Sequence, residues 1–390
     1  MDKLKIKKLS EVCVINPKKS ELGKFNHELE VSFVPMNELN EDCQNFDSKI
    51  IKSLNEVYKG YTYFQNNDVV LAKVTPCFEN GKLGIATNLK NNIGFGSSEF
   101  HVLRPKEVVS AKWIYYSLKT SSFINLAKQR MTGAGGLKRV PTKFIQDWSI
   151  FVPTLKVQEQ IVNKLDHLFE KIDSSIYLLN KNLKNSKNLI NSTLDEEFEK
   201  LEANYKKKPL AEILKVINGR AYKQTEMFSS GKYPILRVGN FFSNRGWYYS
   251  DMELDENKYC EKGDLLYAWS ASFGPKIWDG EKSIYHYHIW KLVPTSKNIS
   301  KKYMYYLLER DTDKIKEEGG RGVGMIHITK GDIEKRMMVI PPLEIQEQVV
   351  SRIEKLYDLH EKMTKELKLK LDNMNALKNS LLDQAFKGEL

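Results

Sequence analysis

The chain has 390 residues, of which 41% are hydrophobic and 28% charged, which is typical of a globular protein and excludes a largely disordered chain. Lys and Arg number 61 against 50 Asp and Glu, and the resulting net charge of +11 suggests a polyanionic partner. No apolar run reaches the ~18–20 residues of a membrane span, and the N-terminus lacks a signal-peptide apolar region, so we expect a cytoplasmic protein without a membrane partner.

Residues 1–152 form the first predicted domain, with 22 basic and 15 acidic residues and therefore a charge of +7. Short apolar or alternating runs predict strands, and turn-forming segments such as ENGK and GAGG separate them. One helix is expected at residues 111–129. The predicted strands lie at residues 33–36, 68–74, 100–105 and 148–153.

Residues 153–204 carry a charge of −2 and are predicted to form one long helix. Pro153 stands where a helix start tolerates proline, and alternating steps of three and four residues place apolar side chains on one seam. The seam positions are Ile161, Leu165, Leu168, Ile172 and Leu179. Weak positions, such as Ser175 and Ser186, are either tolerated irregularities or part of a face reserved for another subunit.

Residues 205–340 form the second predicted domain, again with a charge of +7 from 24 basic and 17 acidic residues. Its pattern resembles that of the first domain: short strands, glycine-containing turns and one helix at residues 301–318. The predicted strands lie at residues 233–240, 264–269, 288–294 and 336–341.

Residues 341–390 carry a charge of −1 and repeat the first long helix with a displacement of 188 residues. FVPTLKVQEQIVNKLDHLF at 151–169 recurs as VIPPLEIQEQVVSRIEKLY at 339–357. The duplicated glutamines, Gln158 with Gln160 and Gln346 with Gln348, are expected on the coiled-coil or partner-binding face. The second seam comprises Val349, Ile353, Leu356, Met363 and Leu367. The duplication predicts an α+β protein with two pseudo-symmetric α/β domains, joined by two long helices that pair as an antiparallel coiled coil.

Motifs for catalysis, cofactor binding or metal binding are not found. The sequence has no G-x-x-x-x-G-K-[ST] phosphate loop and no amino-methyltransferase N/D-P-P-[YFW] signature. GGRGVG at 319–324 is interpreted as a loop, since it follows a helix and precedes a strand, the reverse of a dinucleotide site. His286 and His288 have no nearby Cys or acidic partners, and the four cysteines form no CxxC pair. We expect a non-catalytic chain without a metal or a cofactor of its own.

Two similar basic domains joined by long helices are suited to reading two separated parts of one polyanion, and double-stranded DNA is the expected partner. The glycine-rich loop before the last strand of each domain is the first candidate, because glycine lets the backbone approach phosphate. The loops after the 68–74 and 264–269 strands come second. The predicted DNA-binding residues are Lys73, Lys82, Ser97, Ser98, Arg130, Lys138, Arg139, Arg237, Arg245, Lys276, Arg321 and His327. The aromatic residues Tyr61, Tyr63, Tyr248 and Trp269 are expected in the core.

The duplicated Pro-x-Leu-x-x-Gln-Glu-Gln helix start, the C-terminal SLLDQAFKGEL and the two divergent domains resemble the specificity (S) subunit of type I restriction–modification systems. The resemblance covers essentially the full chain. It implies that each large domain is a target recognition domain for one half of a bipartite, asymmetric DNA sequence, and that the helices set the spacer. It also implies docking of two methyltransferase (M) subunits, which bind S-adenosylmethionine, and association with restriction (R) subunits, which bind ATP.

Two other classes of protein remain open from the residues alone. One is a coiled-coil scaffold without sequence-specific DNA binding, in which Arg139 and Arg321 would be dispensable. The other is an enzyme with an unrecognised active site, such as a methyltransferase with its own recognition domains.

Overall fold

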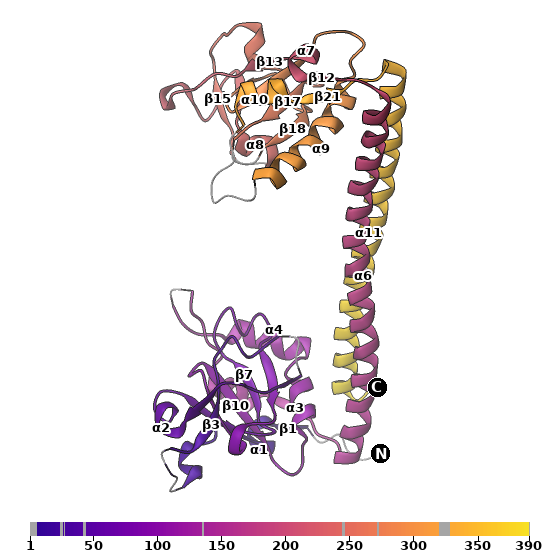
Figure 1. Cartoon of the computed structure of the whole chain (residues 1–390). Coiled ribbons are helices and arrows are strands. Elements are labelled where there is room, and N and C mark those ends of the chain that lie inside the picture. Colours follow the sequence, from indigo (N-terminus) through magenta and orange to yellow (C-terminus); the bar gives the residue numbers. More distant parts are fainter. Residues whose placement is uncertain are drawn as a thin grey trace. The chain divides into compact units, whose positions relative to one another are not determined.

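A computed structural model describes residues 6–23, 26, 28–41, 44–134, 136–243, 246–270, 273–319 and 328–389 (Figure 1). The chain divides into two compact units, the first formed by Met1–Asn180 with Lys368–Leu390 and the second by Lys181–Leu367. Each unit contains one globular domain and part of each long helix. Among the described residues, no helix combines the length and the apolar character that crossing a membrane requires.

The first domain is built on a five-stranded sheet in the order β2-β10-β7-β8-β4, a four-stranded sheet in the order β5-β3-β9-β6 and the pair β1-β11. Its strands are β1 Ile6–Lys8, β2 Cys13–Ile15, β3 Glu30–Val34, β4 Asn45–Phe46, β5 Ile51–Ser53, β6 Thr62–Gln65, β7 Val69–Ala72, β8 Leu83–Ala86, β9 Ile93–Gly96, β10 Phe100–Pro105 and β11 Ser149–Phe151. Its helices are α1 Leu9–Val12, α2 Leu54–Val57, α3 Ala111–Ser117, α4 Ser121–Arg130 and α5 Thr142–Asp147, with 3₁₀ turns η1 Lys19–Leu22 and η2 Lys90–Asn92.

The second domain repeats this plan with sheets in the orders β13-β20-β17-β18 and β15-β14-β19-β16 and the pair β12-β21. Its strands are β12 Lys207–Pro209, β13 Leu214–Asn218, β14 Tyr233–Leu236, β15 Tyr248–Ser250, β16 Tyr259–Cys260, β17 Leu265–Ala268, β18 Gly274–Ile277, β19 Ser283–Tyr285, β20 Ile289–Pro294 and β21 Met337–Val339. Its helices are α7 Leu210–Ile213, α8 Val238–Phe242, α9 Lys301–Gly319 and α10 Lys330–Lys335, with 3₁₀ turns η3 Gln224–Glu226 and η4 Glu256–Lys258.

The central strand of each domain is buried on both faces, which explains its continuous apolar sequence. In β7, Val69 and Leu71 belong to one apolar cluster, whereas Val70 and Ala72 belong to another. In β17 the residues alternate in the same way between two clusters. Because strand side chains alternate between faces, each domain has a core on both sides of this strand.

Each domain has short helices beyond the one expected, and two of the predicted elements have other bounds in the structure. The single helix expected at residues 111–129 is two helices, α3 and α4, because the Thr120 hydroxyl accepts a hydrogen bond from Phe123 N and begins a new helix. The strand expected at residues 233–240 ends at Leu236 and is followed by α8.

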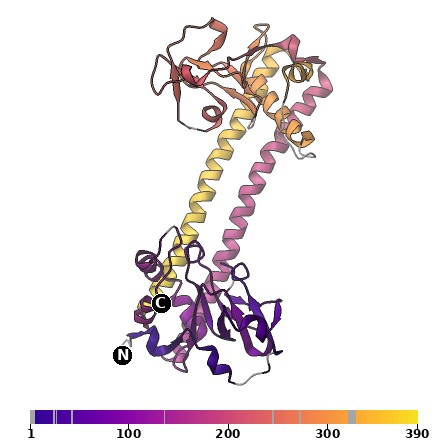
Figure 2. The ribbon, with the colours of Figure 1, turned by 90° about the vertical axis from the view of Figure 1, so that its left-hand side faces the viewer.

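The two long helices are α6 Leu155–Asn204 and α11 Leu343–Lys387, each beginning just after its predicted proline. They run side by side in opposite directions within each unit (Figure 2). In the first unit Asp173 pairs with Lys378 at 2.6 Å, and in the second Glu197 pairs with Arg352 at 2.7 Å. The antiparallel pairing predicted from the two seams is therefore present in both units.

Each domain packs against the N-terminal part of one long helix and the C-terminal part of the other. In the first, the Trp113 ring lies 4.5 Å from that of Phe386, and its Nε1 donates to Phe151 O at 2.8 Å. In the second, Tyr303 lies 5.8 Å from Phe198 and its hydroxyl donates to Val339 O at 2.9 Å. The partners of Trp113 and Tyr303 are separated by 188 residues, so the repeat extends to individual core contacts.

Candidate nucleic-acid interface

Three loops of the first domain meet at one place, which we call the first loop site: residues 73–75 after β7, residues 97–99 between β9 and β10, and residues 136–140 before α5. Lys73 Nζ donates to Ser98 O at 2.8 Å, and Lys73 N donates to Glu99 O at 2.9 Å. Thr75 N donates to Lys138 O at 2.9 Å, and Val140 N donates to Lys73 O at 2.9 Å. Backbone bonds thus hold polar side chains from distant parts of the sequence on one surface.

The glycine-rich segment of this site depends on a tight approach of its two ends. Thr132 and Arg139 exchange two backbone hydrogen bonds, of 3.0 and 2.8 Å. Gly133 has φ +143°, and a Cβ atom there would lie 2.3 Å from Leu137 O. Only glycine fits this position, because any side chain would collide with backbone.

Arg139 is bound by Glu99, a residue that was not among the predicted site residues. Arg139 Nη2 lies 2.7 Å from Glu99 Oε1, and Arg139 Nε lies 2.9 Å from Glu99 Oε2. The Arg139 side chain is 44% exposed and that of Glu99 27%. The hydrogen bonds from Arg139 hold the pKa of Glu99 below its usual range, so the carboxylate stays charged at neutral pH. A guanidinium in this arrangement has a fixed direction but part of its charge is compensated.

The buried side chain of His101 supports the first loop site from the interior of the domain. Its ring is buried, and Nε2 lies 2.8 Å from Val140 O. Burial lowers the pKa of His101, so the imidazole is neutral and serves as a structural hydrogen-bond partner of the loop.

The second domain has an equivalent place, which we call the second loop site: residues 269–270 after β17 and residues 286–288 between β19 and β20. Trp269 N donates to His288 O at 3.0 Å, as Lys73 N does to Glu99 O. Trp269 Nε1 donates to Tyr287 O at 2.8 Å, as Lys73 Nζ does to Ser98 O. The same backbone site therefore presents charged and small polar side chains in one domain and aromatic and imidazole side chains in the other.

The structure brings together some of the predicted DNA-binding residues and separates others. Lys73, Ser97, Ser98, Lys138 and Arg139 share the first loop site. Lys82 instead donates to Met36 O at 3.0 Å, and exposed Arg130 ends α4. Arg237 lies over the Tyr248 ring at 5.4 Å, and Lys276 is 3.4 Å from Asp279. Arg245, Arg321 and His327 lie outside the described residues, as does most of the GGRGVG loop.

The sequence-based prediction of DNA-binding residues did not include Trp269, Tyr287 and His288, because aromatic residues beside a strand are usually in the core. The signal that could have found them is the alignment of NDVVLAK with GDLLYAW, in which Trp269 takes the position of Lys73. Of the four aromatics expected in the core, Tyr63 is buried and Trp269 is half-buried. The expectation is wrong for Tyr61 and Tyr248, which are exposed.

Gln158 and Gln346 have a different role from the one expected on a coiled-coil or partner-binding face. Both are fully buried. Gln158 Oε1 accepts from Ser110 N at 3.0 Å, and its Nε2 donates to Val108 O and Pro153 O. Gln346 makes the same three bonds with Ser300 N, Asn298 O and Pro341 O. Each glutamine therefore fastens the start of a long helix to the loop before α3 or α9.

The remaining predicted helix positions divide by burial. Leu165, Ile172, Val349, Ile353 and Leu367 are buried, and Ile161, Leu168, Leu179 and Leu356 are half-buried. Gln160 and Gln348 are exposed. Met363 is 38% exposed, so it is not a buried seam position. Of the weak positions, Ser186 is buried and its Oγ lies 2.6 Å from His360 Nδ1, which makes this pair a polar contact inside the seam.

Within the described ranges, no group of three or more His, Cys, Asp or Glu side chains could hold a metal ion. His286 and His288 lie with their rings 4.8 Å apart, among aromatic residues. The side chains of the first loop site offer charge and hydrogen bonding, and those of the second offer aromatic and imidazole rings.

Comparison with known proteins gives one family. The profile of the type I restriction modification DNA specificity domain matches residues 1–185 and again residues 202–371. The chain is 37% identical over 166 residues to the type I restriction enzyme EcoAI specificity subunit of Escherichia coli, which covers 42% of this chain and 28% of that protein. It is 27% identical over 322 residues to the EcoKI specificity subunit of E. coli K12, covering 74% of this chain and 68% of that protein.

The chain aligns with little more than a quarter of the EcoAI and EcoEI specificity subunits, 28% and 27% of their lengths. Solved structures add the fold. A chain from a study of complex assembly and conformational transition of the type I R-M system has a TM-score of 0.85 at 18% identity, with 100% of both chains covered. The HsdS subunit from Thermoanaerobacter tengcongensis has a TM-score of 0.66 at 16% identity, covering 100% of this chain and 98% of that chain. These likenesses confirm the predicted fold class.

Proposed function

The chain belongs to the family of type I restriction–modification DNA specificity domains, and from this we propose that it is the DNA-specificity subunit of a type I restriction–modification enzyme. The observation that carries the proposal is duplication. The family profile matches twice, and each match contains a domain with a loop site at the equivalent inter-strand loop, between β9 and β10 or between β19 and β20. Each domain would read one half of a bipartite, asymmetric DNA target.

The two loop sites suit different kinds of DNA contact. Lys73, Lys138 and Arg139 offer donors for phosphate or for guanine, and Glu99 offers acceptors for the amino group of cytosine. Trp269, Tyr287 and His288 offer ring surfaces with few charges. Domains that differ in this way would read different sequences, which is what an asymmetric target requires. The side chains at the two loop sites favour sequence-specific DNA binding over the alternative of a scaffold without it.

We further propose that this chain is non-catalytic and works through partners in the cytoplasm. The helices would set the spacer between the two half-sites and dock two M subunits. The M subunits would bind S-adenosylmethionine and form an adenine-N6 DNA methyltransferase with this chain. R subunits with ATP would join for cleavage. Exposed Gln160 and Gln348 remain candidates for such a partner surface, whereas Gln158 and Gln346 are occupied within the chain.

Selection of DNA from a random pool tests the proposal. The chain with its M partner is mixed with random duplexes, and the retained DNA is sequenced. A bipartite motif with a constant gap is the expected result. A pool without a motif, or two motifs without a fixed spacing, would contradict the proposal. Heating the isolated chain with and without S-adenosylmethionine separates it from a methyltransferase, because a ligand at 100 times its Kd stabilises by ~2.7 kcal/mol, and no shift is expected here.

A further inference from the structure

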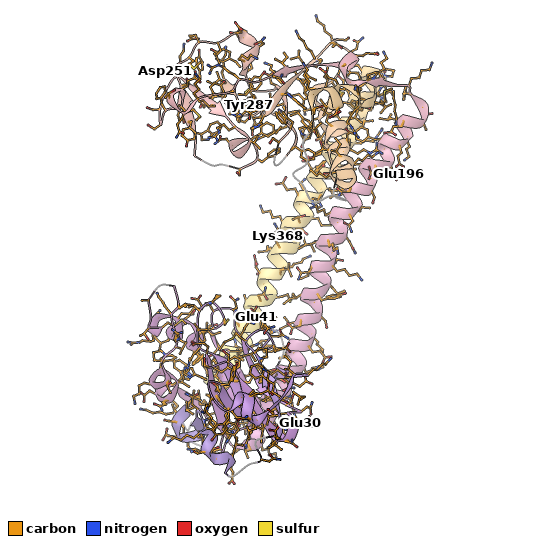
Figure 3. All side chains as sticks on the ribbon, turned by 60° about the vertical axis from the view of Figure 1, so that its left-hand side comes forward. Glu30, Glu41, Glu196, Asp251, Tyr287 and Lys368 are labelled. Carbon is orange, nitrogen blue, oxygen red and sulfur yellow. The ribbon has the colours of Figure 1, made fainter. Side chains whose placement is uncertain are left out.

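The second loop site carries a cluster of aromatic and imidazole rings that the proposed function does not yet explain. The Tyr287 ring lies 3.9 Å from that of His288 and 4.4 Å from that of His286. Trp269 lies 5.0 Å from His288. Tyr287 is 40% exposed, and it is labelled in Figure 3 among the side chains of the second domain. We call Trp269, His286, Tyr287 and His288 the aromatic cluster.

The cluster rests on a rigid base. Trp269 is stacked on Trp290 at 5.8 Å, with 19° between the ring planes, and Trp290 is stacked on buried Tyr267 at 6.0 Å and 20°. The three rings form a column from the core to the surface. Trp269 is the outermost ring of this column. Its Nε1 donates a hydrogen bond to Tyr287 O, and this bond holds the turn that carries Tyr287.

Backbone contacts hold the same turn from its other side. Arg220 N donates to Tyr285 O and Tyr287 N donates to Arg220 O, each at 3.0 Å. A Cβ atom at Gly219 would lie 2.4 Å from His286 O, so glycine permits this close approach. Aromatic side chains held in one conformation lose little entropy on binding, which is a property of contact residues rather than of a loose loop.

Charge distinguishes this cluster from the first loop site. Burial, together with the nearby His288 and Arg237, lowers the pKa of His286 to about 4, so its imidazole is neutral at pH 7. Trp269 and Tyr287 add no charge. These rings themselves supply no positive charge for phosphate, whose binding depends on cations. Their faces and polar edges instead suit base edges, including the C5 methyl group of thymine.

We propose that Tyr287, supported by Trp269 and His288, is a specificity-determining residue that contacts base edges in the half-site read by the second domain. The inference rests on the proposed function and names the contact surface of one of its two half-sites. The equivalent position in the first domain is Ser98, beside charged Lys73, Glu99 and Arg139. The second domain therefore reads bases mainly through uncharged contacts at the place where the first domain uses charged ones.

The test compares DNA selection by the wild-type chain and by Tyr287→Ala, each in complex with the M partner. We expect Tyr287→Ala to retain the first half-site and the gap but to lose base preference at one or two positions of the second half-site. A good base contact discriminates by about 10-fold or more, and this factor should fall close to 1. The slope of log affinity against log salt should stay unchanged, because no phosphate contact is lost.

Phe228→Ala is the matched control, since Phe228 is an exposed aromatic beside the edge strand β15 of the same domain; its selected motif should equal that of the wild type. An unchanged second half-site in Tyr287→Ala would overturn the inference, as would a uniform loss of affinity with a smaller salt slope. Tyr287→Leu, which keeps apolar bulk, replaces the alanine variant if that one fails to fold, with the same criterion. If the wild-type chain itself selects no bipartite motif, the proposed function fails, which is a distinct result.

Discussion

Gln158 and Gln346 are 188 residues apart in the sequence and make the same three hydrogen bonds in the two units. Each side chain is buried and uses its acceptor and both of its donors, in a corner between the start of a long helix and the loop before α3 or α9. This corner fixes the direction in which each helix leaves its domain. The duplicated glutamine is thus explained by attachment of helix to domain.

Replacement of Gln158 by Leu should destabilise the first unit by about 2–4 kcal/mol, because three hydrogen bonds are lost and buried backbone groups stay unpaired. Chemical denaturation followed by circular dichroism measures the loss. Gln160→Leu is the control, since Gln160 is exposed two residues further along the same helix. Similar stabilities for the two variants would show that the Gln158 contacts contribute little.

Glu99→Gln should raise affinity for DNA of any sequence and make its salt dependence steeper. The variant removes a charge that holds Arg139, so the guanidinium becomes available to phosphate. Titration of a random duplex at several salt concentrations measures both effects. Asp147→Asn is the control, because Asp147 also pairs with basic residues, Lys8 and Lys143, and its loss changes the net charge equally. Equal effects of the two variants would assign the gain to net charge alone.

Phe386→Ala should destabilise the first unit and leave the second unchanged, although residue 386 is at the far end of the chain from Trp113. Phe198→Ala should do the reverse, by about 3–5 kcal/mol since Phe198 is fully buried. Hydrogen exchange resolved by peptide reports the two domains separately. Faster exchange in both domains from either single variant would contradict this assignment.

Acidification should weaken the second unit through His286. Its pKa is lowered from the ordinary 6.5 to about 4, so the unfolded chain takes up the proton first as the pH falls. Stability from this group is complete above about pH 6.5 and is lost between pH 6.5 and 4. Measured at pH 7 and at pH 4.5, the free energy of unfolding should therefore fall less for His286→Gln than for the wild type. An equal loss in both proteins would remove His286 as the cause.

Lengthening both long helices should widen the gap between the half-sites. Four residues added to each of α6 and α11 extend a helix by ~6 Å, which corresponds to about two base-pair steps. Random-pool selection of the lengthened protein measures the gap. An unchanged gap would exclude the helices as the element that sets the spacer.

The helices and the domain plan were accessible from the sequence because the 188-residue repeat and the three-four spacing are strong, long-range patterns. The break between α3 and α4 was missed because Thr120 is its cap and neither glycine nor proline marks it. Gln158 was placed on the wrong face because periodicity does not show which loop folds over a helix start. Glu99 was missed because its pairing with Arg139 joins segments 40 residues apart.

The position of Phe386 against Trp113 also has a consequence for synthesis of the protein. The core of the first domain includes Leu382 and Ala385, so it lacks part of its packing until these residues have been synthesised. The second unit consists of one uninterrupted segment, Lys181–Leu367, and has all its residues earlier. Of the two domains, the one that comes first in the sequence is therefore the one whose core is completed later.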